Sequence, residues 1–312
     1  MNIFHMNVCI MPRPRGIIYN NEESTYFLST TMLNAVNDMR LKIDLTNAEL
    51  IEICKTVNPH EYVFSNVSEK ESFHMSVGKI NPPSNFYYEL REIINSFGLL
   101  RMIYSSALYV GEASDNTMQL LFTSPTIRII QMNVDEPPIK MNEPFDIIIL
   151  DNPSNSMSFI KFVLTSLGKD SPLIIKLTNI TNKESIHMLY LLSIVFEKLY
   201  IVKPSIVNIM SNDVFIVGVS FLDNYASYAN VNLNLIEIPN VFLSKIEEFN
   251  SINGHIQLDA YDQVFNILYN KNKWSKMDLL KKSNIQKSQV WCDKNNIPYN
   301  KMGDKVNIFL HT

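Results

Sequence analysis

Three short apolar runs in the middle of the chain show no polar alternation, and a candidate ionisable residue lies directly beside each of them. Asp151 follows residues 147–150, Lys176 follows residues 173–175, and Asp213 precedes residues 214–217. Short runs of this kind, rich in β-branched residues, indicate strands buried on both faces of a parallel sheet. In open α/β sheets, ligands bind beyond the carboxyl ends of the strands. The pattern therefore predicts an α/β fold with a mostly parallel central sheet, helices on both faces, and a site that contains Asp151 and Lys176.

A strand over residues 107–110 leads into Gly111, and a helical stretch over residues 118–122 follows. A strand, a glycine turn and a helix form the opening unit of a nucleotide site, because glycine lets the backbone approach a ligand at the helix N-terminus. An ordinary turn that needs a positive φ is the alternative. The next strand is expected within residues 126–134 and ends near Asn133.

Helical periodicity and capping signals predict helices on both sides of these strands. A helix over residues 47–54 has Thr46 or Asn47 as its cap, and a helix over residues 86–97 has Ser84 or Asn85. Gly98 stands just past the end of the second helix. Further helices are expected over residues 156–167, 183–199, 241–249 and 261–269, and strands over residues 200–202 and 214–221 form a closing hairpin.

Composition says more about the cellular compartment of the protein than about its function. The chain has 312 residues, a formal charge of −4 and three widely spaced cysteines, which suggest neither a disulfide framework nor a metal site. An intracellular, reducing compartment is therefore expected. No apolar run approaches the roughly 18 residues of a membrane span, and residues 12–15 (Pro-Arg-Pro-Arg) interrupt any leader-like start, so no membrane association is expected.

A lysine-dense segment lies near the C-terminus, with Trp274 inside it and Trp291 just beyond it. Its lysines are Lys271, Lys273, Lys276, Lys281, Lys282 and Lys287. Ammonium groups can hold a phosphate backbone while an indole offers a stacking face to a base. A solvated helix face is the alternative meaning of such a segment.

Residues 82–222 resemble the FtsJ-type (RrmJ-type) ribose 2′-O-methyltransferases, in particular the divergent members encoded by large DNA viruses. The resemblance rests on the order of the elements and on local sequence, most specifically on Lys203-Pro204-Ser205 and on residues 211–215 (Ser-Asn-Asp-Val-Phe). It implies a Rossmann-like S-adenosylmethionine-dependent methyltransferase fold. The implied organisation is an N-terminal extension (1–80), a methyltransferase core (81–224) and a helical C-terminal extension (225–312).

The resemblance also implies a Lys-Asp-Lys-Glu tetrad around the target hydroxyl. Asp151 matches the aspartate, Lys176 matches the central lysine, and Asp213 stands where a glutamate is expected. The first lysine aligns with Glu89, which reverses the charge, unless Lys79 supplies it instead. Residues implied to bind the cofactor are Gly111, Glu112, Ala113, Ser114, Asp115, Asn116, Asn133 and Asp151.

Three functions remain open from these observations. The first is S-adenosylmethionine-dependent methylation of an RNA ribose, with capped mRNA as the expected substrate. The second is a non-catalytic subunit that binds and stimulates a viral capping enzyme, as the small subunit of the poxvirus enzyme does for its large subunit. The third is an α/β domain of unrelated function. A viral member of the family would act in the host cytoplasm or the virion.

Overall fold

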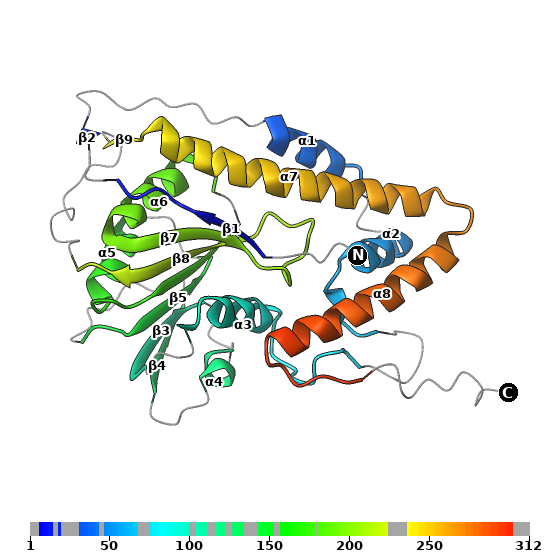
Figure 1. The fold of residues 1–312 in the computed structure, drawn as a ribbon, viewed down its shortest axis with the longest axis horizontal. Helices are drawn as coiled ribbons and strands as arrows, with labels where there is room; N and C mark the ends of the chain where they lie inside the picture. The colour runs from blue at the N-terminus through cyan, green and yellow to red at the C-terminus, as the bar shows by residue number, and fades with distance from the viewer. Residues whose placement is uncertain are drawn as a thin grey trace.

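The computed structural model describes residues 6–14, 18–19, 31–43, 47–67, 75–99, 104–111, 117–122, 127–133, 143–152, 157–178, 180–223 and 236–301. A seven-stranded sheet with the order β1-β7-β8-β6-β5-β3-β4 forms its centre (Figure 1). The strands are β1 (Asn7–Ile10), β3 (Ser106–Val110), β4 (Arg128–Met132), β5 (Ile147–Asp151), β6 (Leu173–Leu177), β7 (Phe196–Lys203) and β8 (Val214–Phe221).

The sheet is parallel in its core and antiparallel at one side. Strands β4, β3, β5 and β6 pair in parallel, whereas β8 runs antiparallel between β6 and β7. The expected closing hairpin is therefore confirmed. The edge strand β1 pairs antiparallel with β7, so a segment from the first 80 residues belongs to the central sheet. These features confirm the predicted Rossmann-like α/β fold class.

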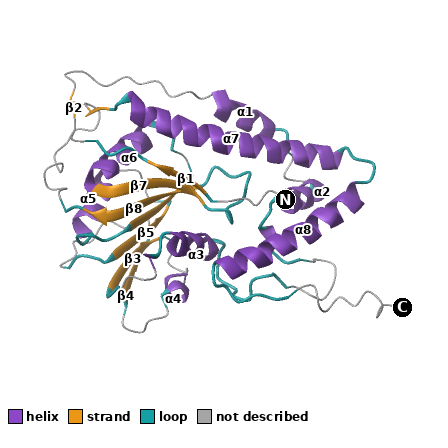
Figure 2. Ribbon diagram, in the orientation of Figure 1, coloured by secondary structure: helices purple, strands orange, loops and turns teal. Residues whose placement is uncertain are grey.

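Helices cover both faces of the sheet (Figure 2). Ile148 and Leu150 of β5 face the larger apolar cluster, which includes residues of α5 (Met157–Ser166), α6 (Lys183–Val195) and α7 (Asn240–Leu268). Ile147 and Ile149 face the opposite cluster, with α3 (Phe86–Ser96) and α4 (Thr117–Leu121). Burial on both faces explains why β5 has no polar alternation.

The remaining helices pack beside the sheet rather than on it. Helices α1 (Thr31–Arg40) and α2 (Ala48–Val57) contact α7, and α8 (Lys273–Lys294) contacts α2 and the 3₁₀ helix η1 (Glu61–Val63). A separate apolar cluster joins α2, α7 and α8. A two-stranded sheet pairs β2 (Ile18–Tyr19) with β9 (Ile236–Glu237).

Two of the expected capping arrangements are present and one is absent. Asn47 caps α2, since its Oδ1 accepts hydrogen bonds from the backbone N–H groups of Glu49 and Leu50 at 3.0 and 3.3 Å. Gly98 follows α3 with a φ of 67°, the left-handed conformation that favours glycine. Asn85, at the N-cap position of α3, has helical backbone angles and makes no side-chain cap.

The helix expected over residues 183–199 ends earlier, at Val195. Residues 196–203 form β7, which begins four residues before the expected start of this strand. Pairing of Phe196 with Phe221 in β8 takes over the backbone hydrogen bonds at this point. Leu199 is buried as the helical pattern requires, but it is buried as part of a strand.

The two short helices expected over residues 241–249 and 261–269 are one long helix, α7. Gly254 lies in the stretch that was expected to separate them. A Cβ at Gly254 would collide with the Met32 side chain of α1, so the glycine allows two helices to pack closely. Tertiary packing therefore outweighs the helix-breaking tendency of this stretch.

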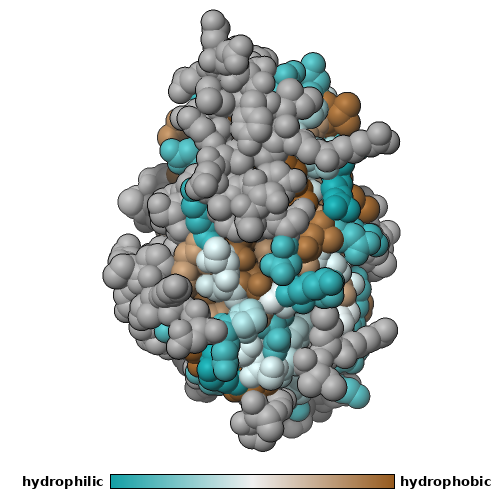
Figure 3. All heavy atoms as spheres, turned by 90° about the vertical axis from the view of Figure 1, so that its left-hand side faces the viewer, coloured by the Kyte–Doolittle hydropathy of each residue, from teal (hydrophilic) through white to brown (hydrophobic). Residues whose placement is uncertain are grey.

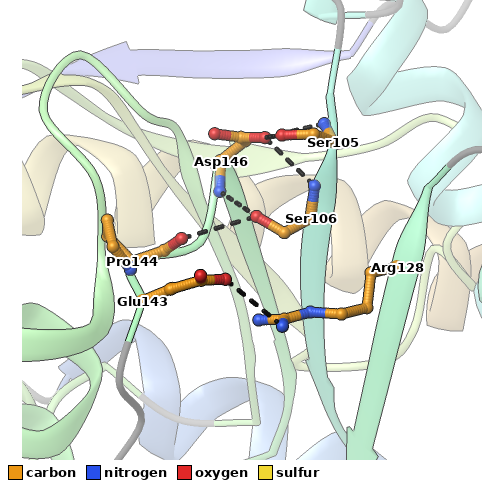
Figure 4. A network of polar contacts seen from close by, with 6 residues as sticks. All are labelled: Ser105, Ser106, Arg128, Glu143, Pro144 and Asp146. Atoms are coloured by element: carbon orange, nitrogen blue, oxygen red, sulfur yellow. Dashed lines mark hydrogen bonds and ion pairs between the residues drawn. The ribbon is translucent and has the colours of Figure 1, made fainter.

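Charged groups at the amino ends of the strands are structural. The Asp146 Oδ2 accepts hydrogen bonds from Ser105 N, Ser105 Oγ and Ser106 N at 2.7, 2.6 and 3.0 Å (Figure 4). Nearby, Arg128 and Glu143 form an exposed ion pair at 3.3 Å. These contacts join β3, β4 and the segment before β5 at the edge opposite the expected ligand site.

The surface at the left-hand end of Figure 1 mixes hydrophobic and hydrophilic residues where the structure describes them (Figure 3). Helix α8, which carries the lysine-dense segment, lies at the other end. The hypothesis of RNA contact therefore concerns the end that carries α8. In the described parts of the chain, no helix is long and apolar enough to cross a membrane.

Candidate functional site

Strand ends at the carboxyl edge of the parallel sheet bring the expected site residues into one row. Asp151 and Lys176 are direct partners in the parallel register of β5 and β6. Gly111 follows Val110, which pairs with Leu150 of β5 and with Met132 of β4. Asp213 directly precedes Val214, the partner of Leu177. The expected convergence of Asp151, Lys176 and Asp213 is therefore confirmed.

The Lys176 side chain lies between aromatic rings and an acid. Its Nζ lies 5.4 Å from the ring centroid of Phe86 and 5.7 Å from that of Phe215, both within cation–π range. It donates a hydrogen bond to Glu89 Oε2 at 2.7 Å. The side chains of Lys176 and Glu89 are 13% and 5% exposed. Glu89 thus reaches Lys176 from the first turn of α3.

Burial and neighbouring charges act together on this pair. Burial raises the pKa of Glu89, Lys176 lowers it, and Asp213 and Asp151 raise it, so the net shift is upward. Burial lowers the pKa of Lys176, but Glu89, Asp213 and Asp151 outweigh this effect, so the net shift is again upward. Lys176 therefore stays charged at neutral pH. Its ammonium group is the positive charge that interacts with the carboxyl groups of Glu89, Asp213 and Asp151.

Lys79, the alternative source of the missing lysine, lies outside this group. It is exposed, and its backbone N–H donates to the carbonyl oxygen of Pro298 at 2.9 Å. Among the described residues, Lys79 makes no ion pair. Glu89, and not Lys79, is therefore the residue that lies beside Lys176.

The expected cofactor residues are described only in part. Gly111 and Asn133 lie at the neighbouring ends of β3 and β4, whereas residues 112–116 lie outside the described residues. A Cβ at Gly111 would collide with the Tyr109 phenol. A side chain at position 111 would therefore require the buried Tyr109 ring to move. Asn133 is half-buried beside it and presents an amide that suits a ribose hydroxyl.

Glu92, one helical turn after Glu89, anchors the loop between β7 and β8. It is 1% exposed and accepts hydrogen bonds from Ser205 N, Ser205 Oγ, Ile206 N and Trp291 Nε1 at 3.1, 2.6, 3.1 and 3.0 Å. Helix α3 therefore places one acid in the site and another beneath the loop that leads to Asp213. Trp291 is buried and cannot offer its indole to RNA, contrary to the surface role considered for it.

Lys203 is a buried lysine that the sequence analysis did not select for the site. It is 8% exposed and donates a hydrogen bond to the carbonyl oxygen of Ser211. Burial lowers the pKa of Lys203 to about 8, and nearby Asp213 acts in the opposite direction. Its signal in the sequence is the one that identified Lys176, because both lysines end an apolar strand.

We predict that Lys203→Met stabilises the protein in phosphate-free buffer at neutral pH, by roughly 1–3 kcal/mol, because a buried charge is removed. The Ser211 carbonyl keeps a donor, since Gln257 Nε2 also reaches it at 2.6 Å. The folded pKa lies below the ordinary value of 10.5, so wild-type stability should rise with pH between about 8 and 10.5. Urea denaturation across this range measures both effects. A destabilised variant, or a variant that keeps the pH dependence, would contradict the prediction, and Lys198→Met, an exposed change in the same strand, is the control.

Five of the six lysines of the lysine-dense segment lie in α8, and some of their side chains already have partners within the chain. Lys273 pairs with Glu49, and Lys281 lies 5.6 Å from the ring centroid of Tyr62. Trp274 is 55% exposed, with the Lys273 ammonium 5.6 Å from its ring centroid. An exposed indole beside lysines suits a stacked base, and RNA contact here stays a prediction.

Comparisons with known proteins give only distant similarities. No family model and no curated protein matches the chain. Among solved structures, a Plasmodium falciparum protein described as a ribosomal RNA methyltransferase is 15% identical, with 45% of this chain and 98% of that chain covered and a TM-score of 0.35. The plantazolicin methyltransferase BpumL, solved in complex with a triazolic desmethylPZN analogue and SAH, is 10% identical, with 82% of this chain and 92% of that chain covered and a TM-score of 0.27. An alphavirus P23pro-zbd structure is 14% identical, with 41% and 22% covered and a TM-score of 0.28.

Proposed function

We propose that this protein is an S-adenosylmethionine-dependent RNA ribose 2′-O-methyltransferase with a degenerate tetrad and weak turnover on its own. The observation that carries the proposal is the position of Lys176. It lies at the carboxyl edge of the parallel sheet, in register with Asp151 and close enough to Asp213 for their charges to interact. A lysine among carboxylates at this edge suits a site that positions a hydroxyl for attack.

The cofactor would lie across the ends of β4, β3 and β5. Asn133 would hydrogen-bond its ribose, the segment 111–116 would hold its amino-acid portion, and Asp151 would border the transferred group. The half-buried amide of Asn133 and the adjacent strand ends fit such a ligand. When bound, the cofactor supplies an electrophilic sulfonium methyl group. Capped mRNA is the proposed substrate, and the exposed lysines of α8 would contact its phosphates.

Glu89 explains why turnover should be weak. A ribose hydroxyl is a poor nucleophile, and a lysine assists it best when the ammonium is free to orient the hydroxyl or when the neutral amine accepts its proton. The 2.7 Å hydrogen bond to Glu89 occupies one donor of Lys176, and the raised pKa keeps the amine protonated. Lys176 would therefore meet the hydroxyl as a charged donor held by Glu89, and not as a neutral amine that accepts its proton.

The same ion pair favours a second candidate function. A methyltransferase fold whose central lysine is neutralised by an acid suits a non-catalytic subunit that binds and stimulates the large subunit of a capping enzyme. In this case the site would contribute to stability and shape, and the partner would perform the chemistry. Fold alone does not separate the two functions, because related folds support both roles.

Cofactor binding provides the first test. We predict that the protein binds S-adenosylmethionine and S-adenosylhomocysteine in calorimetric titration. Asn133→Ala should weaken binding roughly three- to tenfold, the effect of losing about one hydrogen bond. Asn266→Ala, an exposed substitution on α7, is the matched control. The absence of measurable binding by the wild type would exclude the enzymatic function and leave the non-catalytic one.

A further inference from the structure

A second polar region lies behind the candidate site, beneath α7. A cavity of about 120 Å³ separates α1 and α7 from the carboxyl edge of the sheet and from the loop between β7 and β8. This loop runs below α7 in Figure 1. Its polar lining includes Lys203, Thr178, Ser211, Asn212, Asn250 and Gln257. Val214, which also lines the cavity, belongs to the apolar cluster of α6 and α7, whereas Lys176 contacts Phe86 and Phe215 on the opposite face.

The Lys203 ammonium gives this cavity a buried positive charge. An ammonium group has three N–H donors, and the Lys203 ammonium donates one hydrogen bond, to the carbonyl oxygen of Ser211. Within the described ranges, no carboxylate forms an ion pair with Lys203. Asp213 is the acid whose charge reaches it from the same loop. A buried ammonium without an ion-pair partner is costly, so an anion beside it would be strongly favoured.

The α7 side of the cavity adds an amide donor. Asn250 Nδ2 is buried and has no hydrogen-bond partner among the described residues. Asn250 and Lys203 both line this cavity, Asn250 from α7 and Lys203 from the end of β7. A buried donor without an acceptor costs free energy comparable to a lost hydrogen bond. An oxyanion between these groups would satisfy both.

The neighbouring side chains keep this arrangement in place. Gln257 Nε2 donates to Ser211 O at 2.6 Å and to Asn212 Oδ1 at 2.9 Å, so α7 is tied to the loop that carries Asp213. The cavity has room for roughly four waters at about 30 Å³ each, which is enough for a small tetrahedral anion. Water alone would hydrate the ammonium without neutralising it.

We propose that this cavity binds a phosphate group, held by the Lys203 ammonium and the Asn250 amide. The group is either free phosphate or the terminal phosphate of a nucleotide chain. The inference does not depend on methyl transfer, because the lining lies on the other face of the sheet from Lys176. Binding would fix the loop that leads to Asp213 and would thereby couple phosphate to the geometry of the candidate site.

The test is thermal unfolding of the full chain with inorganic phosphate or sulfate, against chloride at matched ionic strength. We expect the wild type to be stabilised by the oxyanions and Lys203→Met to lose about tenfold or more in affinity for them. Lys198→Met, in the same strand but exposed, should respond as the wild type does. Asn250→Ala should weaken binding without removing a charge. An unchanged response in Lys203→Met, or no stabilisation of the wild type by either oxyanion, would overturn the proposal.

A second arm identifies the source of the phosphate. A short RNA with a 5′-phosphate is compared with the same RNA ending in a 5′-hydroxyl, using wild type and Lys203→Met. A preference for the phosphorylated RNA that disappears in Lys203→Met supports a nucleotide phosphate, whereas a response to inorganic phosphate alone supports the free ion. S-adenosylmethionine titration is run separately, so failure of the methyltransferase proposal leaves this result interpretable.

Discussion

Lys176→Ala is expected to abolish methyl transfer to capped RNA. The lysine is the central cation of the candidate site. Once the ammonium group is removed, the carboxyl groups of Asp151, Asp213 and Glu89 would leave the target hydroxyl beside uncompensated negative charge. Loss of a positioned acid–base group generally lowers rates by about 10²–10⁴-fold, which would take an already weak activity to background. The measurement is transfer of a radiolabelled methyl group from S-adenosylmethionine to capped RNA.

Stability must be measured alongside activity, because Lys176 is also one half of a buried ion pair. Removing one partner of such a pair costs up to about 3–5 kcal/mol, although Glu89 can lessen the cost by taking up a proton. The double variant Lys176→Met/Glu89→Gln removes both charges and should fold more stably than Lys176→Ala while remaining inactive. Lys198→Ala is the matched exposed control. Turnover retained in a folded Lys176→Ala protein would remove Lys176 from the mechanism.

The row of residues at the carboxyl edge could be predicted because it depends on local sequence alone. An apolar run that ends in a charge indicates both a buried strand and the point where that strand meets solvent. Parallel strands share one carboxyl edge, so Asp151 and Lys176 had to lie near one another once both runs were recognised as neighbours. Their direct register, with Glu89 within hydrogen-bond distance of Lys176, required the structure.

Features that depend on distant partners could not be predicted in this way. Strand β7 begins as early as Phe196 because this residue pairs with Phe221 of β8. Helix α7 is continuous through Gly254 because Met32 of α1 packs against this glycine. Trp291 stood in a lysine-rich context that suggested exposure. It is buried in the apolar cluster that contains α3, where Glu92, almost 200 residues earlier in the chain, accepts its indole hydrogen bond. Sequence periodicity predicts which residues face the core, but it does not predict which distant segment packs against them.

Lys203 shows how the same sequence signal can lead to two different environments. Like Lys176, it ends an apolar strand, yet Lys176 meets a carboxylate and Lys203 meets a carbonyl oxygen and a cavity. The difference arises because the two side chains lie on opposite faces of the sheet, where α3 and α7 respectively cover them. Among the described residues, α3 brings the acid Glu89 into contact with Lys176, whereas no acid of α7 forms an ion pair with Lys203.

The charge of Glu89 can be used to separate the two proposed functions, because it affects both RNA binding and the pKa of Lys176. With Lys176 charged and Asp151, Asp213 and Glu89 ionised, the site would carry a net negative charge. Such a site repels an RNA backbone, although the raised pKa of Glu89 lessens the repulsion when this acid takes up a proton. Glu89→Lys would change the charge by two and place a second ammonium beside Lys176. The repulsion between these groups would lower the pKa of Lys176 and bring it closer to a neutral amine at working pH.

We therefore expect the wild type to show weak or no intrinsic methylation of capped RNA, and Glu89→Lys to bind RNA roughly tenfold more tightly at low salt, with a steeper salt dependence. Glu197→Lys makes the same charge change at an exposed position of β7, so it separates a site effect from a general gain in positive charge. The measurements are RNA affinity over a salt series and methyl transfer by all three proteins. Tighter binding with new turnover in Glu89→Lys would support a restrained enzyme, and tighter binding without turnover would support the non-catalytic subunit. Robust wild-type turnover, or a Glu89→Lys protein that binds RNA no better than Glu197→Lys does, would show that Glu89 does not control the site.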